Sequence, residues 1–371
     1  MINKIQLSDK TTNFLIALGK SSLALVTALF IGGVIISLGG YSFVEVYVSI
    51  FKGSLGTSRG LILTLATATP IMLTGLGFAL GIKVGIVNTG LEGQLYAGAM
   101  IAALVGAYIP LPSGLHTAVA LLAGGAAGGL IGALMSLFKI RFGAPEVITG
   151  IMLNSVVMFF TSYLSNVPLK PEGAAAAQTK EIFETARLTR IVPRSQLTTA
   201  LFIAILMCIL VYFMHKKTVW GYQMMVIGLN PRAADVAGIN SSYMYTAALS
   251  LSGFMAGLAG SGLVLGIFRR FIEEVSSGLG FQGIPVSALA GHNPLGVIAS
   301  ALLFGALEAG SLIVNQSTAI PFEFVDVVQA LVVVFVAAPA MITDPFKFVC
   351  MKIRKRRLTD AISEVPHEEG E

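Results

Sequence analysis

The stretch "GQLYAGAMIAALVGAYIPLPSGLHTAVALLAGGAAGGLIGALMSLF" at residues 93–138 carries no Asp, Glu, Lys or Arg. A helix needs about 20 consecutive apolar residues to cross a bilayer, so this run is too long for one crossing. The segment "IPLPSG" at 109–114 interrupts it with two prolines and a glycine, which is typical of a turn. The stretch therefore predicts two membrane-spanning helices joined by a tight connection.

The same character extends along the chain of 371 residues, of which 55% are hydrophobic and 12% charged. A soluble domain carries about 25% charged residues, and the mean hydropathy here is +0.83. Further runs with little or no charge occupy 21–40, 60–82, 147–165, 197–215, 243–267, 281–314 and 325–343. These numbers predict a polytopic membrane protein.

The run 281–314 is broken by "GHNPLG" at 291–296, where Asn-Pro marks a turn. Its first piece is too short to span a bilayer alone and is typical of a discontinuous helix buried in a bundle. We therefore predict an all-α membrane helix bundle of about ten transmembrane segments, one of them this short discontinuous helix.

The basic residues indicate how the bundle is oriented. They gather at Lys4, Lys10 and Lys20 before the first run, at Lys139 and Arg141 between the fourth and fifth, at Lys216 and Lys217 between the sixth and seventh, and in "KIRKRR" (352–357) after the last. These regions share one side of the membrane only if the number of segments is even. The positive-inside rule then places both termini in the cytoplasm, whereas nine segments would put the tail outside.

This orientation predicts the domain organisation. A cytoplasmic segment (1–20) precedes a transmembrane domain (21–343), and a cytoplasmic tail (344–371) follows it. Within that domain the mixed-charge loop 166–196 lies outside and the loop 216–242 lies in the cytoplasm. The net charge of +5 comes from these ends and loops, so it does not indicate nucleic-acid binding.

The stretch "VIGLNPRAADVAGIN" at 226–240 is a short polar segment between apolar runs. Asn230 is a good N-cap, Pro231 suits the first helical position, and Gly238 suits the left-handed position after a helix. About two helical turns lie between them. So short a helix is marginal in water and needs a surface to pack against.

Two interpretations of this helix stay open. It could rest on the membrane surface or on neighbouring loops. An interfacial helix, however, presents Trp, Phe or Leu on its apolar face, and this helix has none. Ala233, Ala234 and Ala237 instead give it a small, smooth face, which favours a groove in another protein.

Polar residues occur beside several apolar runs. In "GIVNTGLEGQLYAGAM" (85–100), Thr89 and Glu92 have the spacing of a reciprocal capping box. The functional alternative is that Asn88, Glu92 and Gln94 line a polar pathway at the start of a half-helix.

A second set of polar residues lies further along the chain. In "APEVITGIMLN" (144–154), Pro145 and Glu146 start a helix, and Asn154 inside the span needs either a partner on another helix or a ligand. Glu308, Asn315 and Asp326 flank the last runs and could line a path or meet water at an interface. The substrate-pathway candidates are therefore Asn88, Glu92, Gln94, Asn154, Glu308 and Asn315.

Glycines spaced by four residues predict that helices pack closely. They are Gly77, Gly81 and Gly85, then Gly124, Gly128 and Gly132, then Gly253 and Gly257. This spacing indicates a compact bundle and does not by itself indicate a channel.

The sequence lacks the signatures of an enzyme. "GKS" at 19–21 is preceded by Phe14 where a P-loop needs glycine, so we expect no ATP site in this chain. His116 and His292 are isolated, no metal-ligand spacing occurs, and the two cysteines imply no disulfide framework. We expect no catalytic residue, no metal and no cofactor in this chain.

Four motifs together resemble a known family. They are "VNTGLEGQLYAGA", "APEVITGIMLN", "GLNPRAADVAGI" and "GFQGIPVSALAGHNPLGVIASALLFGALEAGS". In this order they resemble the permease subunits of bacterial ABC importers of the ribose/branched-chain amino acid type, and most of all the permeases of purine nucleoside importers, often labelled simple-sugar permeases. The resemblance covers roughly residues 60–343.

The resemblance implies a multi-pass protein of the bacterial cell membrane that imports a purine nucleoside such as guanosine, or a simple sugar, by alternating access. It implies a second, related permease as a heterodimer partner, a cytoplasmic ATPase that binds ATP and Mg, and an external substrate-binding lipoprotein. It also implies a coupling segment seated in a groove of the ATPase. By position this segment comprises Gly228, Asn230, Pro231, Arg232, Ala233, Ala237 and Gly238.

Two other functions compete with this interpretation. An ion-coupled secondary transporter or channel for a small polar solute would need charged relays deep in the spans, where only Glu308 lies plausibly. A membrane-embedded enzyme would need a nucleophile with a base, or a metal cluster, at membrane depth.

Overall fold

The computed structural model describes residues 26–317 together with residues 327, 330, 331 and 334. The chain divides into two compact units, one formed by Ser42–Val325 and the other by Met1–Tyr41 with Asp326–Glu371. In the second unit the structure describes the apolar helix Val26–Leu38, which lies within the first run that we predicted to span the membrane. The segment 1–20, the tail 344–371 and most of the run 325–343 lie outside the described residues.

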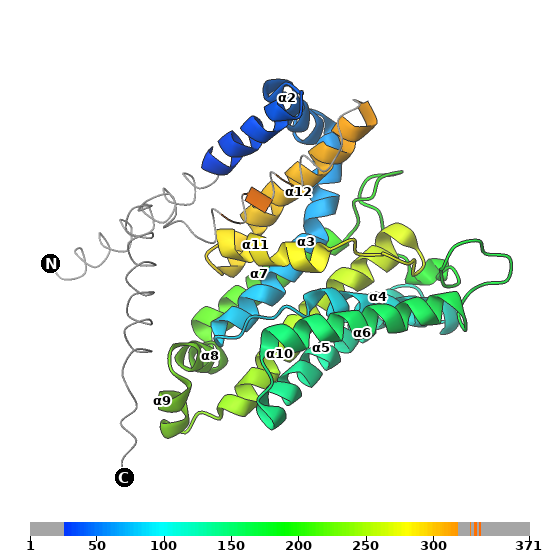
Figure 1. Ribbon diagram of the computed structural model, residues 1–371. Helices are drawn as coiled ribbons and strands as arrows, with labels where there is room; N and C mark the ends of the chain where they lie inside the picture. Colours follow the sequence, from blue (N-terminus) through cyan, green and yellow to red (C-terminus); the bar gives the residue numbers. More distant parts are fainter. Residues whose placement is uncertain (1–25, 318–326, 328–329, 332–333, 335–371) are drawn as a thin grey trace, which may run out of the picture. The chain divides into compact units, whose positions relative to one another are not determined.

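The larger unit is built from long helices (Figure 1). They are α3 (Ser58–Lys83), α4 (Leu91–Tyr108), α5 (Leu115–Phe142), α6 (Glu146–Asn166), α7 (Ala200–Lys217), α10 (Ser241–Gly262), which continues as the π-helix η2 (Leu263–Phe268), and α12 (Pro294–Ser317). Six of these helices are long and apolar enough to cross a bilayer, and α4 is not among the six. The interruption predicted at 109–114 is confirmed, because α4 ends and α5 begins on either side of it.

Shorter helices join the long ones: α2 (Phe43–Ser54), the 3-10 turn η1 (Glu184–Ala186), α8 (Val219–Leu229), α9 (Pro231–Val236) and α11 (Leu279–Leu289). The short helix α11 is the discontinuous helix expected before "GHNPLG". Two others were not predicted. The helix α8 lies inside 216–242, which we expected to be a loop with only one short helix, and α2 lies between the first two runs.

The helix α10 lies at the centre of this unit and packs against α5, α4 and α3. Glycine makes the close approach possible. A methyl group added at Gly128 of α5 would overlap the carbonyl oxygen of Gly253 on α10, and one added at Gly257 would overlap that of Gly124. The predicted close packing is therefore confirmed for these glycines. Gly81 and Gly85 are exceptions, because a methyl group at Gly81 would meet the carbonyl oxygen of Ile86 in the segment after α3, and Gly85 makes the turn there with a φ of +78°.

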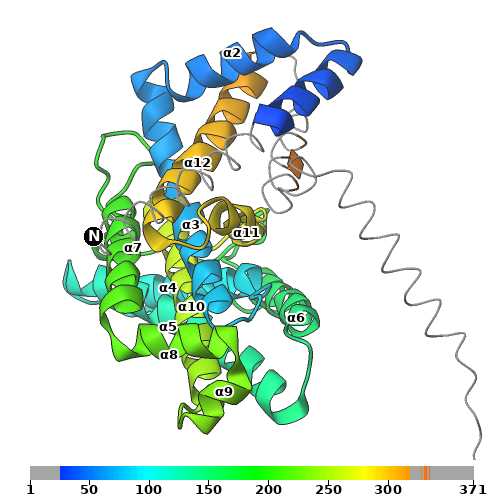
Figure 2. The same cartoon turned by 90° about the vertical axis from the view of Figure 1, so that its left-hand side faces the viewer.

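The helix α11 crosses α3 near the middle of α3 (Figures 1 and 2). The hydroxyl of Thr74 donates a hydrogen bond to the carbonyl of Leu279 at 3.0 Å, and Val286 lies against Gly75. Thr74 lies sixteen residues into α3, far from either end. The short helix therefore buries one face against the middle of α3, as expected for a discontinuous helix within a bundle.

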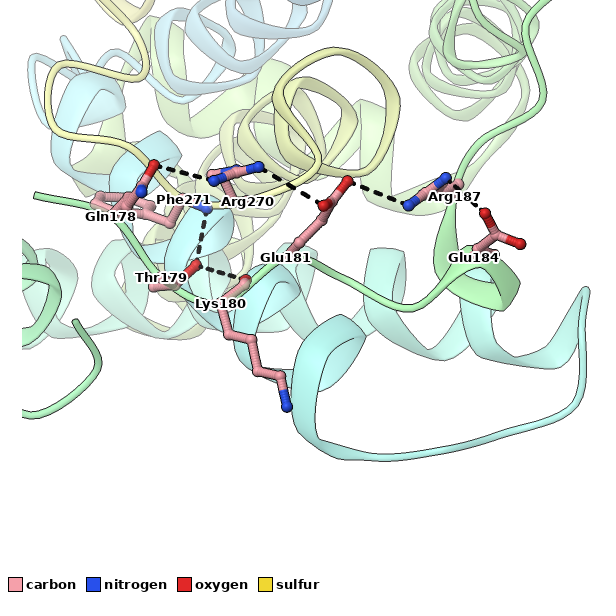
Figure 3. A network of polar contacts seen from close by, with 8 residues as sticks. All are labelled: Gln178, Thr179, Lys180, Glu181, Glu184, Arg187, Arg270 and Phe271. Atoms are coloured by element: carbon pink, nitrogen blue, oxygen red, sulfur yellow. Dashed lines mark hydrogen bonds and ion pairs between the residues drawn. The ribbon is translucent and has the colours of Figure 1, made fainter. Parts of the chain in front are cut away.

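The connection 167–199 is a long, mostly irregular segment held down by charged side chains (Figure 3). The carboxylate of Glu181 accepts from Arg187 at 3.1 Å and lies 3.6 Å from Arg270. The backbone N–H of Phe271 donates to the hydroxyl of Thr179 at 3.0 Å. These contacts attach the segment to the chain that follows η2.

Candidate functional site

The helix α4 begins inside the bundle. After α3 ends at Lys83, the chain turns at Gly85 and runs back along α3, so that Leu91 lies beside Gly77. Six residues of α helix are about 9 Å long, which places the first residue of α4 roughly that far from the end of α3. A helix N-terminus is thereby carried into the interior, together with the polar residues around it.

Asn88 and Gln94 form the first half of a buried polar cluster, and both side chains are inaccessible to solvent. The Nδ2 of Asn88 donates to Gln94 Oε1 at 3.0 Å and to the hydroxyl of Ser252 on α10 at 2.8 Å. The Oδ1 of Asn88 accepts from the backbone N–H of Gly90 at 2.9 Å. The amide groups thus hold the extended segment before α4 against α10.

Asn154 of α6 forms the second half of the cluster. Its Oδ1 accepts from the backbone N–H of Gly93 at 2.8 Å, and its Nδ2 donates to the carbonyl of Thr89 at 2.8 Å. Both of these groups belong to the start of α4. Of the two roles that the sequence left open for Asn154, an interhelix bond and a ligand contact, the structure shows the first.

Glu92 joins α4 to the discontinuous helix α11. Its two carboxylate oxygens accept from the backbone N–H groups of Gly278 at 3.1 Å and Gly280 at 2.7 Å, at the N-terminus of α11. The carboxylate therefore satisfies N–H groups that a helix leaves free and meets the positive end of its dipole. Two helix N-termini meet at this one buried side chain.

The capping box predicted for Thr89 and Glu92 is wrong. Gly90 is the N-cap of α4 and makes no side-chain cap bond. The hydroxyl of Thr89 donates instead to the carbonyl of Val147 on α6 at 3.0 Å. Both side chains have partners distant in the sequence, and tertiary contacts replace the local box.

The structure does not bring Glu308 into this cluster. Its neighbours on α12, Gly305 and Gly310, lie against Ala68 of α3 and Ile50 of α2. The cluster lies beside Gly77, about 13 Å further along α3. Glu308 is half-buried, and the side chain of Asn315 lies outside the described part of the chain.

The capped segment predicted at 230–238 is confirmed as α9. The Oδ1 of Asn230 accepts from the backbone N–H of Ala233 at 3.1 Å, and Pro231 occupies the first helical position. Gly238 follows the helix with a φ of +80°. This helix lies at the end of the bundle where α10 begins, away from the long connection 167–199 (Figures 1 and 2).

The face that α9 presents differs in one respect from the expectation. Ala234 is fully buried and packs in a cluster with residues such as Met224, Ile227 and Met244, so it attaches the helix to its own bundle. Arg232, Ala233 and Ala237 are exposed. Val236 was missed by the sequence analysis although 91% of it is exposed. The outward face therefore consists of small or apolar side chains together with two exposed charged residues, Arg232 and Asp235.

Gly228 allows α8 to approach the end of α3. A methyl group at this position would overlap the carbonyl oxygen of Lys83. Because α9 follows α8 directly, this contact and buried Ala234 fix α9 to the bundle at two places. A force applied to α9 would consequently reach α3 and α10.

The chemistry available at the cluster is hydrogen bonding by amides and one carboxylate. Among the residues that the structure describes, no group of three His, Cys, Asp or Glu side chains is placed to hold a metal ion. The polar groups near the start of α4 bind one another in the conformation seen here. They can therefore meet a solute only if α4, α6 or α11 moves.

Six bilayer-length helices around a packed interior, with two further helices that begin inside it, define a multi-pass protein of the cell membrane. The chain belongs to the family of permease components of branched-chain amino acid transport systems, whose sequence profile matches residues 60–337. It is thus a permease subunit of an ABC transporter, and the resemblance seen in the sequence is confirmed.

Three relatives illustrate the range of the family. NupP of Bacillus subtilis, a guanosine ABC transporter permease protein, is 32% identical over 90% of this chain and 96% of its own. NupQ of the same organism, also a guanosine ABC transporter permease protein, is 29% identical over 67% of this chain and 81% of its own. TsgB13 of Haloferax volcanii, a glucose ABC transporter permease protein, is 28% identical over 86% of this chain and 87% of its own.

Proposed function

We propose that this permease forms part of the translocation pathway of an ATP-driven importer for a nucleoside, such as guanosine, or for a simple sugar. The relatives named for guanosine and for glucose support this substrate class. Amide-rich hydrogen bonding in the buried cluster suits a neutral polar solute, because amides donate and accept without carrying charge.

The helix α9 is the proposed coupling element, and its geometry is the observation that carries the mechanism. It is capped at both ends, buried on one side by Ala234, and exposed on the other through Arg232, Ala233 and Val236. So short a helix keeps its shape only if it is capped and packed. ATP binding in a partner would move α9, and α8 and α10 would transmit the movement into the bundle by alternating access.

The proposed orientation places α9 in the cytoplasm, with about ten spans and both termini on that side. It is supported by basic residues near the same end of the bundle. Lys139 lies 5.8 Å from the ring centre of Tyr245, close to the start of α10, and Lys216 and Lys217 directly precede α8.

The proposed assembly contains a cytoplasmic ATPase that binds ATP and Mg, a second permease and an external substrate-binding lipoprotein. The occurrence of two related guanosine permease proteins, NupP and NupQ, in one organism supports a heterodimer. In this chain Asn88, Glu92, Gln94 and Asn154 are the proposed pathway residues at the start of α4. Glu308 and Asn315 on α12 are a second, separate pair of candidates.

The experiment that tests this function begins with gentle purification of the chain from its own membranes. We expect an ATPase and a second permease to accompany it, and the reconstituted assembly to take up labelled guanosine or ribose only with ATP. Replacing Arg232 with Glu should uncouple ATP hydrolysis from uptake at unchanged expression, whereas Arg232→Lys should keep coupling. Uptake driven by an ion gradient, without ATP, would contradict the proposal.

A further inference from the structure

A cavity of about 260 Å³ opens beside α6 at the end of the bundle that holds the long connection. Its lining combines aromatic, hydroxyl and carboxylate side chains: Tyr96, Phe159, Ser162, Phe271, Glu273 and Glu274. Pockets for small ligands have volumes of about 300–1,000 Å³, so this cavity lies just below that range and has room only for a small solute. It lies apart from α9, which is at the other end of the bundle.

The cavity continues the polar cluster outward. Tyr96 follows Glu92 by four residues on α4, and Ser162 follows Asn154 by eight residues on α6. Residues four apart lie on the same face of a helix, one turn from each other. The same faces of α4 and α6 therefore carry polar groups from the buried cluster to the cavity.

Its polar groups are acceptors of the kind that bind hydroxyls. The hydroxyl of Ser162 donates to Glu273 Oε1 at 2.6 Å, and both Glu273 and Glu274 are exposed. An ionised carboxylate only accepts hydrogen bonds, and its two oxygens offer several acceptor positions. Two adjacent carboxylates consequently favour a neighbouring pair of hydroxyl donors and repel an anionic solute.

Aromatic rings supply the flat surfaces of the cavity. Phe159 is 76% exposed, and the ring of Tyr96 meets that of Phe271 edge to face with centres 6.2 Å apart. Exposed aromatic rings cover the flat face of a base or a sugar ring and lose little entropy when they do so. The cavity thus offers an apolar side at Phe159 and an acidic side at Glu273.

The segment that carries the carboxylates is held in place. The backbone N–H of Glu273 donates to the carbonyl of Ala177 at 3.2 Å, and that of Phe271 donates to Thr179. Glu274 and Ser277 have φ values of 59° and 48°, in the left-handed region that non-glycine residues rarely adopt. The backbone that carries the two carboxylates is therefore held in place by these contacts.

We propose that this cavity is the outer recognition site of the pathway, where Glu273 and Glu274 accept hydrogen bonds from vicinal hydroxyls while Phe159 covers the ring of the solute. The inference rests on the proposed function and adds a location and a specificity to it. The sugar hydroxyls would then be recognised in the cavity before the solute reaches the buried cluster. Tyr96, which lines the cavity, lies one helical turn after Glu92 on α4.

The test uses the assembled transporter in membrane vesicles, with labelled guanosine as the transported probe and 2′,3′-dideoxyguanosine as a competitor that lacks the two hydroxyls. Glu273→Gln and the double variant with Glu274→Gln remove the charges. Glu172→Gln is the matched control, because Glu172 is an exposed carboxylate of the long connection that does not line the cavity.

We expect Glu273→Gln to raise the KM for guanosine about tenfold, because the hydroxyl then meets a neutral amide in place of a charged acceptor, and the double variant to raise it further. The inhibition constant of the dideoxy compound should change less than about twofold, since it lacks the 2′ and 3′ hydroxyls that the two carboxylates would bind. The control should match the wild type. An unchanged KM for guanosine in the double variant would contradict the proposed site. An equal rise in the KM for guanosine and in the inhibition constant of the dideoxy compound would contradict it too. Both results would leave ATP-driven uptake, and so the proposed function, in place. Failure of the wild-type assembly to take up guanosine or ribose would instead reject the proposed function.

Discussion

The carboxylate of Glu92 accepts the backbone N–H of Gly280 at 2.7 Å, across 188 residues of sequence. This bond links the first turn of α4 to the first turn of α11 in a buried environment. The bond therefore couples the positions of the two helices that begin inside the bundle. If the first turn of either helix moved, the first turn of the other would have to move with it, or the hydrogen bond would break.

Removal of the Glu92 carboxylate should therefore lower the stability of the folded protein. In Glu92→Ala, the N–H groups of Gly278 and Gly280 lose their acceptor, and each buried unsatisfied group costs about 1–3 kcal/mol. We expect a clear fall in the thermal unfolding temperature of the detergent-purified protein. Glu146→Ala is the control, because it removes a partly exposed ion pair with Lys139 worth about 0–1 kcal/mol. Equal unfolding temperatures for the two variants would contradict the account.

Packing between α5 and α10 should depend on the absence of a side chain at Gly128. A methyl group there would overlap the backbone of Gly253, which cannot move aside as a side-chain end can. We expect Gly128→Ala to destabilise by about 1–3 kcal/mol, the usual cost of overpacking. Gly262→Ala on α10 should be nearly neutral, since its nearest neighbour would lie at 3.5 Å. Thermal unfolding of both variants in the same detergent separates the two cases.

The cap of α9 should be measurable on its own. Asn230→Ala removes the acceptor for the N–H of Ala233 and should destabilise the helix by about 1 kcal/mol, whereas Asn230→Asp keeps an acceptor. Amide hydrogen exchange over residues 232–238 reports the difference. We expect several-fold faster exchange in the alanine variant only. The same rate in both variants would show that packing of Ala234, and not the cap, holds the helix.

The contacts of the long connection should weaken in salt. Glu181 faces Arg187 and Arg270 at a partly exposed position, where an ion pair is worth about 0–1 kcal/mol and is screened by ions. Glu181→Ala should speed amide exchange over 178–188 at low salt and should have little effect at high salt. Lys180→Ala serves as the neighbouring control. A salt-independent effect would indicate that packing around buried Ile182 fixes the segment instead.

The parts of the site that the sequence predicted are the local ones. Asn230, Pro231 and Gly238 act through backbone groups within four residues, so their types and spacing suffice to predict a capped helix. The turn at 109–114 follows from proline and glycine in the same way. The class of fold follows from apolar runs whose length only a bilayer requires.

The missed features depend on residues that are distant in sequence. The spacing of Thr89 and Glu92 matched a capping box, yet Val147 and Gly280 are better placed partners in the folded bundle. The helix α8 was missed because its eleven mostly apolar residues are too few to span a bilayer and lie between charged residues, as a loop would. Ala234 and Ala233 are indistinguishable in sequence, and only the packing of α9 on the bundle buries one and exposes the other.

The role of α9 is tested most directly by a photo-crosslinker placed at Val236, which is 91% exposed, in cells that express the whole transporter. We expect a crosslinked product that contains the cytoplasmic ATPase, and none when the crosslinker stands at Glu172 on the long connection. Capture of the ATPase from Glu172, or of no nucleotide-binding protein from Val236 in an assembly active in uptake, would contradict the role of α9 as the coupling helix.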